Sequence, residues 1–267
     1  METVPAFIVL DERDGREWFR PTGHTRGPWD PDACHAGPPT GVLVRAAERL
    51  LPDQQLVRIT VDLTRPIPHA GFAIEARVAR AGRTVSTSEL AIIDGDGRTV
   101  VTARGMHVAP LDPGHLGALA TTPYSVPPLA ASAVGAFPIP PAGHDLPMFS
   151  GGVEVRYPPG DAPTPGPTRM WMRTVALVLG EEASGFQRIC ALADCGNAVS
   201  RNAEADGLGF VNTDLAVSIH RTPVGEWFGI DSVSRWEPNG VGISDSLLFD
   251  EQGAVGRAIQ TLVIRPR

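Results

Sequence analysis

Lysine is missing from this chain of 267 residues, so arginine supplies all of its permanent positive charge. The absence of lysine excludes reactions that proceed through a lysine Schiff base, including those of lysine-bound pyridoxal phosphate. It also excludes the phosphate-binding loop whose lysine contacts nucleotide phosphates. The formal net charge is −7, and no basic run interrupts the acidic balance. We therefore expect no nucleic-acid surface.

Cysteine and long apolar runs are also scarce. The three cysteines form no Cys-x-x-Cys pair and no disulfide framework, so buried free thiols are expected. No stretch approaches the roughly 18 consecutive apolar residues that a membrane helix requires. Residues 1–5 show neither the basic start nor the apolar stretch of a signal peptide. These features predict a cytoplasmic protein that does not enter a membrane.

The first half of the chain combines one helix with several strands. Apolar residues at helical spacing, from Val42 to Leu50, predict a helix over residues 40–51 that Pro52 ends. Stretches rich in Val, Ile and Thr, separated by Gly- and Asp-rich hairpin signals, predict strands. These strands cover residues 5–10, 16–20, 56–64, 71–81, 84–93 and 99–108.

The second half repeats this order after a different kind of segment. Residues 109–147 are rich in Pro, Ala and Gly without periodicity, which predicts a connection that lies on the surface. A helical segment is expected at 186–204. The strands expected around it cover residues 149–157, 168–178, 210–220, 225–236, 240–249 and 255–265. We therefore divide the chain into an N-terminal unit (1–108), the connection (109–147) and a C-terminal unit (148–267).

The two halves align at a constant offset of 156 positions from the helix onward, which indicates a duplication. Identical residues at this offset include Cys34 and Cys190, Arg45 and Arg201, Arg65 and Arg221, Ser88 and Ser244, and Asp94 and Asp250. Each unit then has one helix that a long antiparallel sheet can wrap, an α+β architecture. Arg65 and Arg221 recur at the same strand end, which favours a structural salt bridge, although either could meet a phosphate.

One asymmetry in the repeat points to function. Asp194 is expected at the start of the second helix, where the first half has Pro38. Asp commonly caps helices, but Pro also begins them well, so both halves have a suitable start and only one carries charge. Gln260 likewise replaces Arg104, and a Gln among apolar strand residues needs hydrogen-bond partners.

The order of a strand pair, a helix and a four-stranded meander is similar to a hotdog fold, and two in tandem resemble a double hotdog. Local sequences resemble the type II acyl-CoA thioesterase-like superfamily. They are the helix approach HAGPPTG at 35–41, the strand NTDLAVSIHR at 212–221, GEW at 225–227 and GRAIQ at 256–260. The resemblance covers almost the whole chain except the connection.

This resemblance implies hydrolysis of a fatty acyl-CoA thioester to the free acid and CoA by direct water attack, without metal or cofactor. It also implies an Asp at the second helix, a Thr- or Ser-type residue on the next strand and a Gln on the last strand. These positions correspond to Asp194 and Gln260, with either Asn212 or Thr213 as the third. The count along the strand favours Asn212, and alternation lets only one of the two face the site.

Thioester hydrolysis needs a positioned water, a base or orienting group for it, and donors for the developing oxyanion. Asp194 could polarise the water, and Gln260 and Asn212 could orient it. Backbone N–H groups at the start of the helix after Asp194 could hold the thioester oxygen.

Two other functions stay open on the sequence. The Asn in place of Thr is compatible with an acyl-CoA- or lipid-binding protein without catalysis. Asp30 and His35 have the spacing of an acid–base pair that resembles hotdog enoyl-CoA hydratases, although a loop histidine is commonly structural. In each case acyl-CoA is the expected partner, and exposed sheet edges would allow homo-oligomers.

Overall fold

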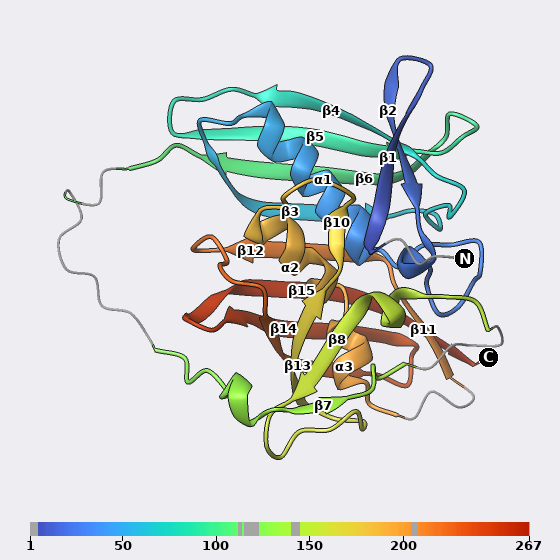
Figure 1. Cartoon of the computed structure of the whole chain (residues 1–267), viewed down its shortest axis with the longest axis vertical. Coiled ribbons are helices and arrows are strands. Elements are labelled where there is room, and N and C mark those ends of the chain that lie inside the picture. Colours follow the sequence, from blue (N-terminus) through green and yellow to red (C-terminus); the bar gives the residue numbers. More distant parts are fainter. Residues whose placement is uncertain (1–4, 112–113, 115–122, 140–144, 204–207, 267) are drawn as a thin grey trace.

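The computed structural model describes residues 5–111, 114, 123–139, 145–203 and 208–266. It confirms the predicted α+β double hotdog (Figure 1). The helices are α1 (Gly37–Leu50), α2 (Gly185–Ala193) and α3 (Gly196–Ser200), with short 3-10 turns at η1 (Gly23–Thr25), η3 (Leu129–Ala131) and η4 (Phe149–Gly152). None of the helices described is long and apolar enough to cross a membrane.

The main sheet contains strands of both halves. Its first-half strands are β3 (Gln55–Leu63), β4 (Ala73–Arg80), β5 (Val85–Ile93) and β6 (Thr99–Val108). Its second-half strands are β7 (Ala133–Gly135), β8 (Val153–Tyr157), β9 (Thr168–Thr174), β11 (Leu208–Asn212), β12 (Asp214–Ile219), β13 (Phe228–Trp236), β14 (Val241–Asp250) and β15 (Gly253–Pro266). The strand order is β4-β5-β6-β3-β12-β15-β14-β13-β9-β8-β7, and β11 pairs with β15.

The two halves join through antiparallel pairing of β3 with β12, in which Val61 lies opposite Leu215 and Ile59 opposite Val217. All four side chains are buried. They belong to one hydrophobic core that extends through both halves. The helices α1 and α2 pack against each other on the same side of the sheet (Figure 1). The duplication therefore produces one continuous sheet instead of two separate ones.

A second, small sheet also crosses between the halves. It contains β1 (Ala6–Arg13), β2 (Arg16–Pro21) and β10 (Ala176–Val178) in the order β10-β1-β2. The first strand of the chain runs parallel to β10, with Ala6 opposite Ala176 and Ile8 opposite Val178. This strand thus connects the start of the chain to its second half.

The offset of 156 holds for the strands but not for the helices. Strand β5 begins at Val85 and β14 at Val241, as the offset requires. The first helix begins at Gly37, whereas α2 begins at Gly185 and ends where the offset would start it. The side chain of Ser184 caps α2 by accepting a hydrogen bond from the backbone N–H of Gln187 (3.2 Å).

The expected helix start at Asp194 is therefore wrong. Asp194 follows the last residue of α2 and lies in the joint between α2 and the short helix α3. The backbone N–H of Cys195 reaches back to the carbonyl of Leu192 (2.8 Å), which tightens the end of α2. Helix α3 ends at Ser200, and the last predicted position, 204, lies outside the described residues.

The described residues of the connection pack against the second half. Strand β7 adds to the sheet edge beside β8. The hydroxyl of Tyr124 donates to Asp231 on β13 (3.0 Å). Phe137 and Ile139 reach the junction of the two halves. Pairing with an existing strand supplies the order that the local sequence lacks.

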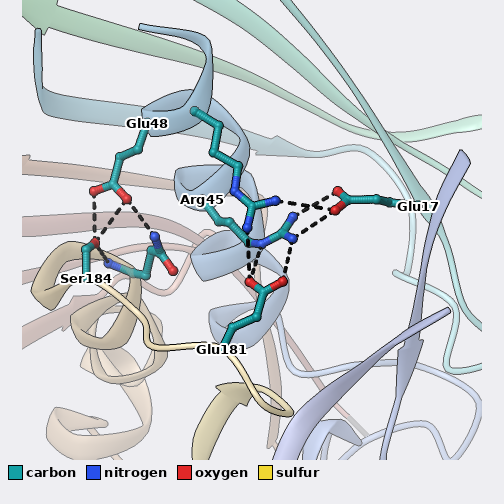
Figure 2. A network of polar contacts seen from close by, with 7 residues as sticks. Glu17, Arg45, Glu48, Glu181 and Ser184 are labelled. Carbon is teal, nitrogen blue, oxygen red and sulfur yellow. Dashed lines mark hydrogen bonds and ion pairs between the residues drawn. The ribbon is translucent and has the colours of Figure 1, made fainter. Parts of the chain in front are cut away.

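A buried arginine fixes α1 against both halves (Figure 2). Arg45 on α1 is 2% exposed. Its guanidinium donates twice to Glu17 on β2 (2.9 Å each) and twice to Glu181 after β10 (2.7 Å each). On the next turn, Glu48 accepts from Ser184 and from Gln187 Nε2 (2.6 Å), which ties α1 to the start of α2. These charged contacts give α1 a defined position at the junction.

Replacement of Arg45 by Met should lower the free energy of unfolding by about 2 to 3 kcal/mol at neutral pH, measured by urea denaturation. This loss is below that of a fully buried pair because both carboxylates remain partly hydrated. As a matched control, Arg77→Met removes an exposed arginine from Glu89 and should change stability little. An equal loss of unfolding free energy in the two variants would contradict the stabilising role of Arg45 at the junction.

The effect of Arg45→Met should also depend on pH. The hydrogen bonds from Arg45 lower the pKa of Glu17 and of Glu181 below the usual 4.5. Stability from a lowered carboxyl pKa is present above the unfolded value and is lost as pH falls through the folded value. The difference between wild type and variant should therefore narrow below about pH 4.5.

Candidate active site

A cavity of about 420 Å³ lies at the junction of the two halves. The loop before α1 and the segment after β3 form its first-half side, and the second half contributes the joint at Asp194, α3, β11 and β15. Its wall is largely apolar. The large apolar side chains in it are Trp29, Leu63, Ile67, Phe137, Ile139, Phe210, Val211 and Leu262.

Asp194 lies in the wall of this cavity and is 9% exposed. Its carboxylate Oδ1 accepts from Asn212 Nδ2 (2.7 Å) and from Gln260 Nε2 (3.1 Å). The same Gln260 nitrogen lies 3.0 Å from the backbone carbonyl of Asp194. The structure thus brings together three of the four residues that the sequence singled out, from the joint after α2, the end of β11 and the middle of β15.

His35, from the first half, completes the surroundings of Asp194. Its Nδ1 lies 3.0 Å from Asp194 Oδ2. The ring stacks on Phe149, with centroids 4.0 Å apart and planes 6° apart. Asp30 lines the same cavity, but no hydrogen bond or ion pair joins it to His35 among the described residues, and Asp30 accepts from the backbone N–H of Asp32 (2.8 Å). The histidine that the sequence assigned to an alternative site therefore belongs to this one.

The protonation of this pair follows from its surroundings. His35 Nδ1 has two neighbours, Asp194 Oδ2 at 3.0 Å and the backbone nitrogen of Gly37 at 3.2 Å. The Gly37 N–H also donates to the Asp194 carboxylate, and a carboxylate oxygen can only accept, so we assign the proton of a neutral His35 to Nδ1, directed at Asp194. Burial lowers the pKa of His35, against the opposing charge of Asp194. Burial also raises the pKa of Asp194, while His35, Asn212 and the backbone of Gly37 and Ala36 act in the opposite direction. Burial thus favours a neutral imidazole, and the donors that contact Asp194 favour its carboxylate form.

The remaining ring nitrogen of His35 is then an acceptor. Among the residues described, no group forms a hydrogen bond with His35 Nε2. His35 lines the cavity, and among the side chains around Asp194 its Nε2 is the basic atom that no hydrogen bond occupies within the described structure. Asp194, in contrast, is surrounded by donors.

Gln260 is buried, 2% exposed, and its amide forms hydrogen bonds at both ends. The backbone N–H of Asn197 donates to Gln260 Oε1 (3.2 Å), which fixes the orientation of the amide because a backbone N–H can only donate. Both hydrogens of Nε2 are then directed at Asp194. The Nε2 group of Gln260 thus contacts Asp194 and holds it in place, and a second lone pair of Oε1 is available to a water molecule.

Asn212 and Thr213 both line the cavity and lie at a bend in the chain. Strand β11 ends at Asn212 and β12 begins at Asp214, so Thr213 interrupts the alternation of faces. Asn212 can thus contact Asp194 while Leu215 is also buried. Thr213 is exposed, and its hydroxyl donates to the carbonyl of Thr261 (3.4 Å). The assumption of a regular strand, which put Thr213 on the face of Leu215, is wrong here.

Asn197 is a polar residue of the cavity wall that sequence reasoning missed. It lies on α3, three positions after Asp194, and is 2% exposed. Its side-chain oxygen accepts from the indole N–H of Trp236 (2.8 Å). The available signal was an Asn inside a predicted helix, where this residue is intrinsically unfavourable.

The two repeated arginines have different surroundings. Arg221 forms a bidentate pair with Asp250 (2.7 and 2.5 Å), as a structural role predicts. Arg65 is exposed in the cavity wall, and its guanidinium has no partner in the described part of the chain, so the expected salt bridge is wrong for Arg65. No group of three His, Cys, Asp or Glu side chains among the described residues is arranged to hold a metal ion.

Comparison with known families identifies the class of protein that this fold and cavity define. Residues 25–108 match the family described as acyl-CoA thioesterase N-terminal domain, and residues 128–264 match the acyl-CoA thioesterase C-terminal domain. The chain belongs to this acyl-CoA thioesterase family. The second match begins before β7, which agrees with the packing of that strand against the C-terminal half.

Solved structures share the fold over nearly the full chain. A hot dog fold protein from Alicyclobacillus acidocaldarius is 18% identical with a TM-score of 0.72, covering 100% of this chain and 98% of its own. A protein assigned as a thioesterase II from Thermobifida fusca is 19% identical, with a TM-score of 0.71 and coverages of 97% and 95%. The acyl-CoA thioesterase II TesB2 from Mycobacterium marinum is 16% identical, with a TM-score of 0.63 and the same coverages. No curated protein matches the chain.

The approach of α3 to the sheet sets a steric requirement at Gly196. A Cβ there would lie 2.6 Å from Ser246 Oγ, 2.7 Å from Ser244 Oγ and 3.1 Å from Gln260 Oε1. Gly196→Ala should therefore lower the free energy of unfolding by about 1 to 3 kcal/mol. Urea denaturation would measure this loss. Introduced into a Ser244→Gly, Ser246→Gly background, the same change should be less costly, and an equal loss in both backgrounds would refute the steric origin.

Proposed function

We propose that this protein hydrolyses a fatty acyl-CoA thioester to the free acid and CoA by direct attack of water. The observation that carries this proposal is the convergence of His35, Asp194 and Asn212 in the wall of one largely apolar cavity. Apolar walls with a few convergent polar groups are typical of sites for small molecules. Family membership supports the same chemistry.

In this proposal His35 acts as the general base. Its Nε2 accepts a proton from water while Asp194 holds the Nδ1–H and stabilises the imidazolium that forms. The water oxygen bonds to the thioester carbon, the bond between carbon and sulfur breaks, and the CoA thiolate takes the proton from His35. Sequence reasoning gave the water to Asp194; in this proposal Asp194, which is contacted by several donors, positions His35 instead.

The remaining groups then have separate tasks. Asn212 uses one N–H on Asp194, and its second N–H and its oxygen can orient the attacking water. The apolar walls would cover the acyl chain. Arg65 lies in the cavity wall, and its guanidinium, with which no other described residue pairs, would attract the CoA phosphates. The reaction consumes one thioester and one water molecule and needs no other reactant.

The direct test is release of the CoA thiol from a panel of acyl-CoAs of different chain length, followed with a thiol-reactive dye. Wild type should turn over at least one member of the panel. Asp194→Ala should remain folded and lose at least about a hundredfold in kcat, because His35 loses the partner that fixes its tautomer. Circular dichroism and thermal melting serve as the control for folding.

Three other outcomes of these assays would contradict the proposed site or support a different function. A folded Asp194→Ala variant with full activity would refute the site. Tight acyl-CoA binding by wild type without turnover at any chain length would support the binding protein considered above. Loss of enoyl absorbance with a 2-enoyl-CoA would support a hydratase.

A pair of neighbouring variants tests the assignment of the third residue. Asn212→Ala should reduce kcat strongly, since it removes a donor to Asp194 and the amide proposed to orient water. Thr213→Ala should retain most of the activity, because the Thr213 hydroxyl contacts a backbone carbonyl instead of Asp194. Both variants are assayed with the best substrate of the panel, and the reverse pattern would exchange the two roles.

A further inference from the structure

Asn197 carries a buried donor without a partner. Its Nδ2 is inaccessible to solvent and forms no hydrogen bond with any of the residues that the structure describes. Burial of an unpaired amide N–H is unfavourable, and such groups are uncommon in folded proteins. Asn197 is nevertheless part of the cavity wall, beside Asp194 and Gln260. A ligand in the cavity becomes a partner for this nitrogen only if it displaces the side chains that cover Nδ2 in this structure.

The orientation of the Asn197 amide is fixed by its neighbour. The indole N–H of Trp236 can only donate, so the Asn197 atom 2.8 Å away must be the oxygen. Trp236 is itself positioned by Phe210, whose ring centroid lies 5.7 Å away, and Phe210 packs edge-on against Trp29 (5.1 Å). The amide cannot turn its oxygen toward the cavity without leaving the indole N–H unpaired.

The backbone around Asn197 is also fixed by hydrogen bonds, like its side-chain amide. Its N–H donates to Gln260 Oε1, which couples it to the amide that binds Asp194. On the other side of α3, the hydroxyls of Ser200 and Ser232 both donate to the carbonyl of Gly196 (2.9 Å each). These serines belong to a buried cluster of hydroxyls with Ser234, Ser244 and Ser246. The unpaired donor is thus presented by a rigid support.

We propose that Asn197 Nδ2 donates a hydrogen bond to the carbonyl oxygen of the bound thioester. As water bonds to the carbonyl carbon, the electron pair of the C=O π bond moves to oxygen, and Asn197 stabilises that negative charge. The pair returns when the bond to sulfur breaks. This role rests on the proposed hydrolysis and replaces the backbone N–H groups expected from the sequence, of which that of Asn197 is engaged by Gln260.

The kinetic test compares Asn197→Ala with a matched control, Asn202→Ala. Asn202 is an exposed amide just beyond α3 whose Nδ2 is already bonded to the carbonyl of Ser234 (2.9 Å). Asn197→Ala should lower kcat about a hundred- to a thousandfold with a smaller change in KM, as for removal of one oxyanion donor. Asn202→Ala should leave kcat unchanged. Equal activity of Asn197→Ala and wild type would overturn the proposal.

A binding measurement separates this inference from the proposed function. Two stable analogues are compared by calorimetry: a ketone, in which CH₂ replaces sulfur and the carbonyl is kept, and a thioether without the carbonyl. Wild type should bind the ketone at least about tenfold more tightly, as expected for a hydrogen bond that meets a buried unpaired donor. Asn197→Ala should lose this preference, whereas Asp194→Ala should keep it.

The outcomes are distinguishable. If the protein hydrolyses no thioester but still prefers the ketone to the thioether through Asn197, the proposed function is overturned and the contact of Asn197 with the carbonyl oxygen is supported. Hydrolysis with the same preference in Asn197→Ala would overturn this contact alone. If Asn197→Ala does not fold, Trp236→Phe decides, since it leaves Asn197 in place but frees its amide to turn. It should reduce both the preference and kcat, and unchanged values would overturn the proposal.

Discussion

The antiparallel pairing of β3 with β12 is the interaction on which the rest of the molecule depends. It joins two duplicated sheets into one and places α1 and α2 side by side. With this junction fixed, the loop before α1 reaches the joint after α2, and His35 meets Asp194. Neither half contains this pair by itself. The candidate site is therefore a product of the junction and not of either unit.

Duplication supplies two equivalent junction positions, but only one carries the polar group. The second half differs where the helix is broken into α2 and α3, which leaves Asp194 at the joint with both its carboxylate and its carbonyl engaged. The unbroken α1 has Pro38 and Pro39 in its first turn instead. If α2 continued without a break into α3, Asp194 would be an ordinary side chain in the middle of the helix. The break thus makes one of two similar positions suitable for chemistry.

The fold could be predicted from the sequence because its signals are local. Strand periodicity and the hairpin residues around Asp94 and Asp250 predict the meanders, and the strand offset of 156 follows from aligning them. The break of the second helix could not be predicted in this way. The early start of α2 was equally hidden, because it depends on the cap at Ser184 and on the contact of Ser184 with Glu48, a residue far away in the sequence.

The candidate site was predictable in part. Asp194 and Gln260 stand out as polar residues at positions where the repeat has none of the same kind. The inward direction of Asn212 depends on the bend at Thr213, which strand alternation cannot reveal. The partner of His35 is set by tertiary packing, and its nearest acidic residues in sequence are the wrong ones. Asn197 becomes notable only when the donor of Trp236 is known.

The parallel pairing of β1 with β10 has a consequence for the order in which the protein can be made. The first strand leaves the ribosome early, but its partner, Ala176–Val178, emerges only after most of the chain. Until then the hairpin of β1 and β2 has an open edge, and contacts between such distant segments form slowly. The two units, although related by duplication, are thus expected to complete their folding together. Separating the gene between them would leave each product with an unpaired strand edge and an incomplete cavity.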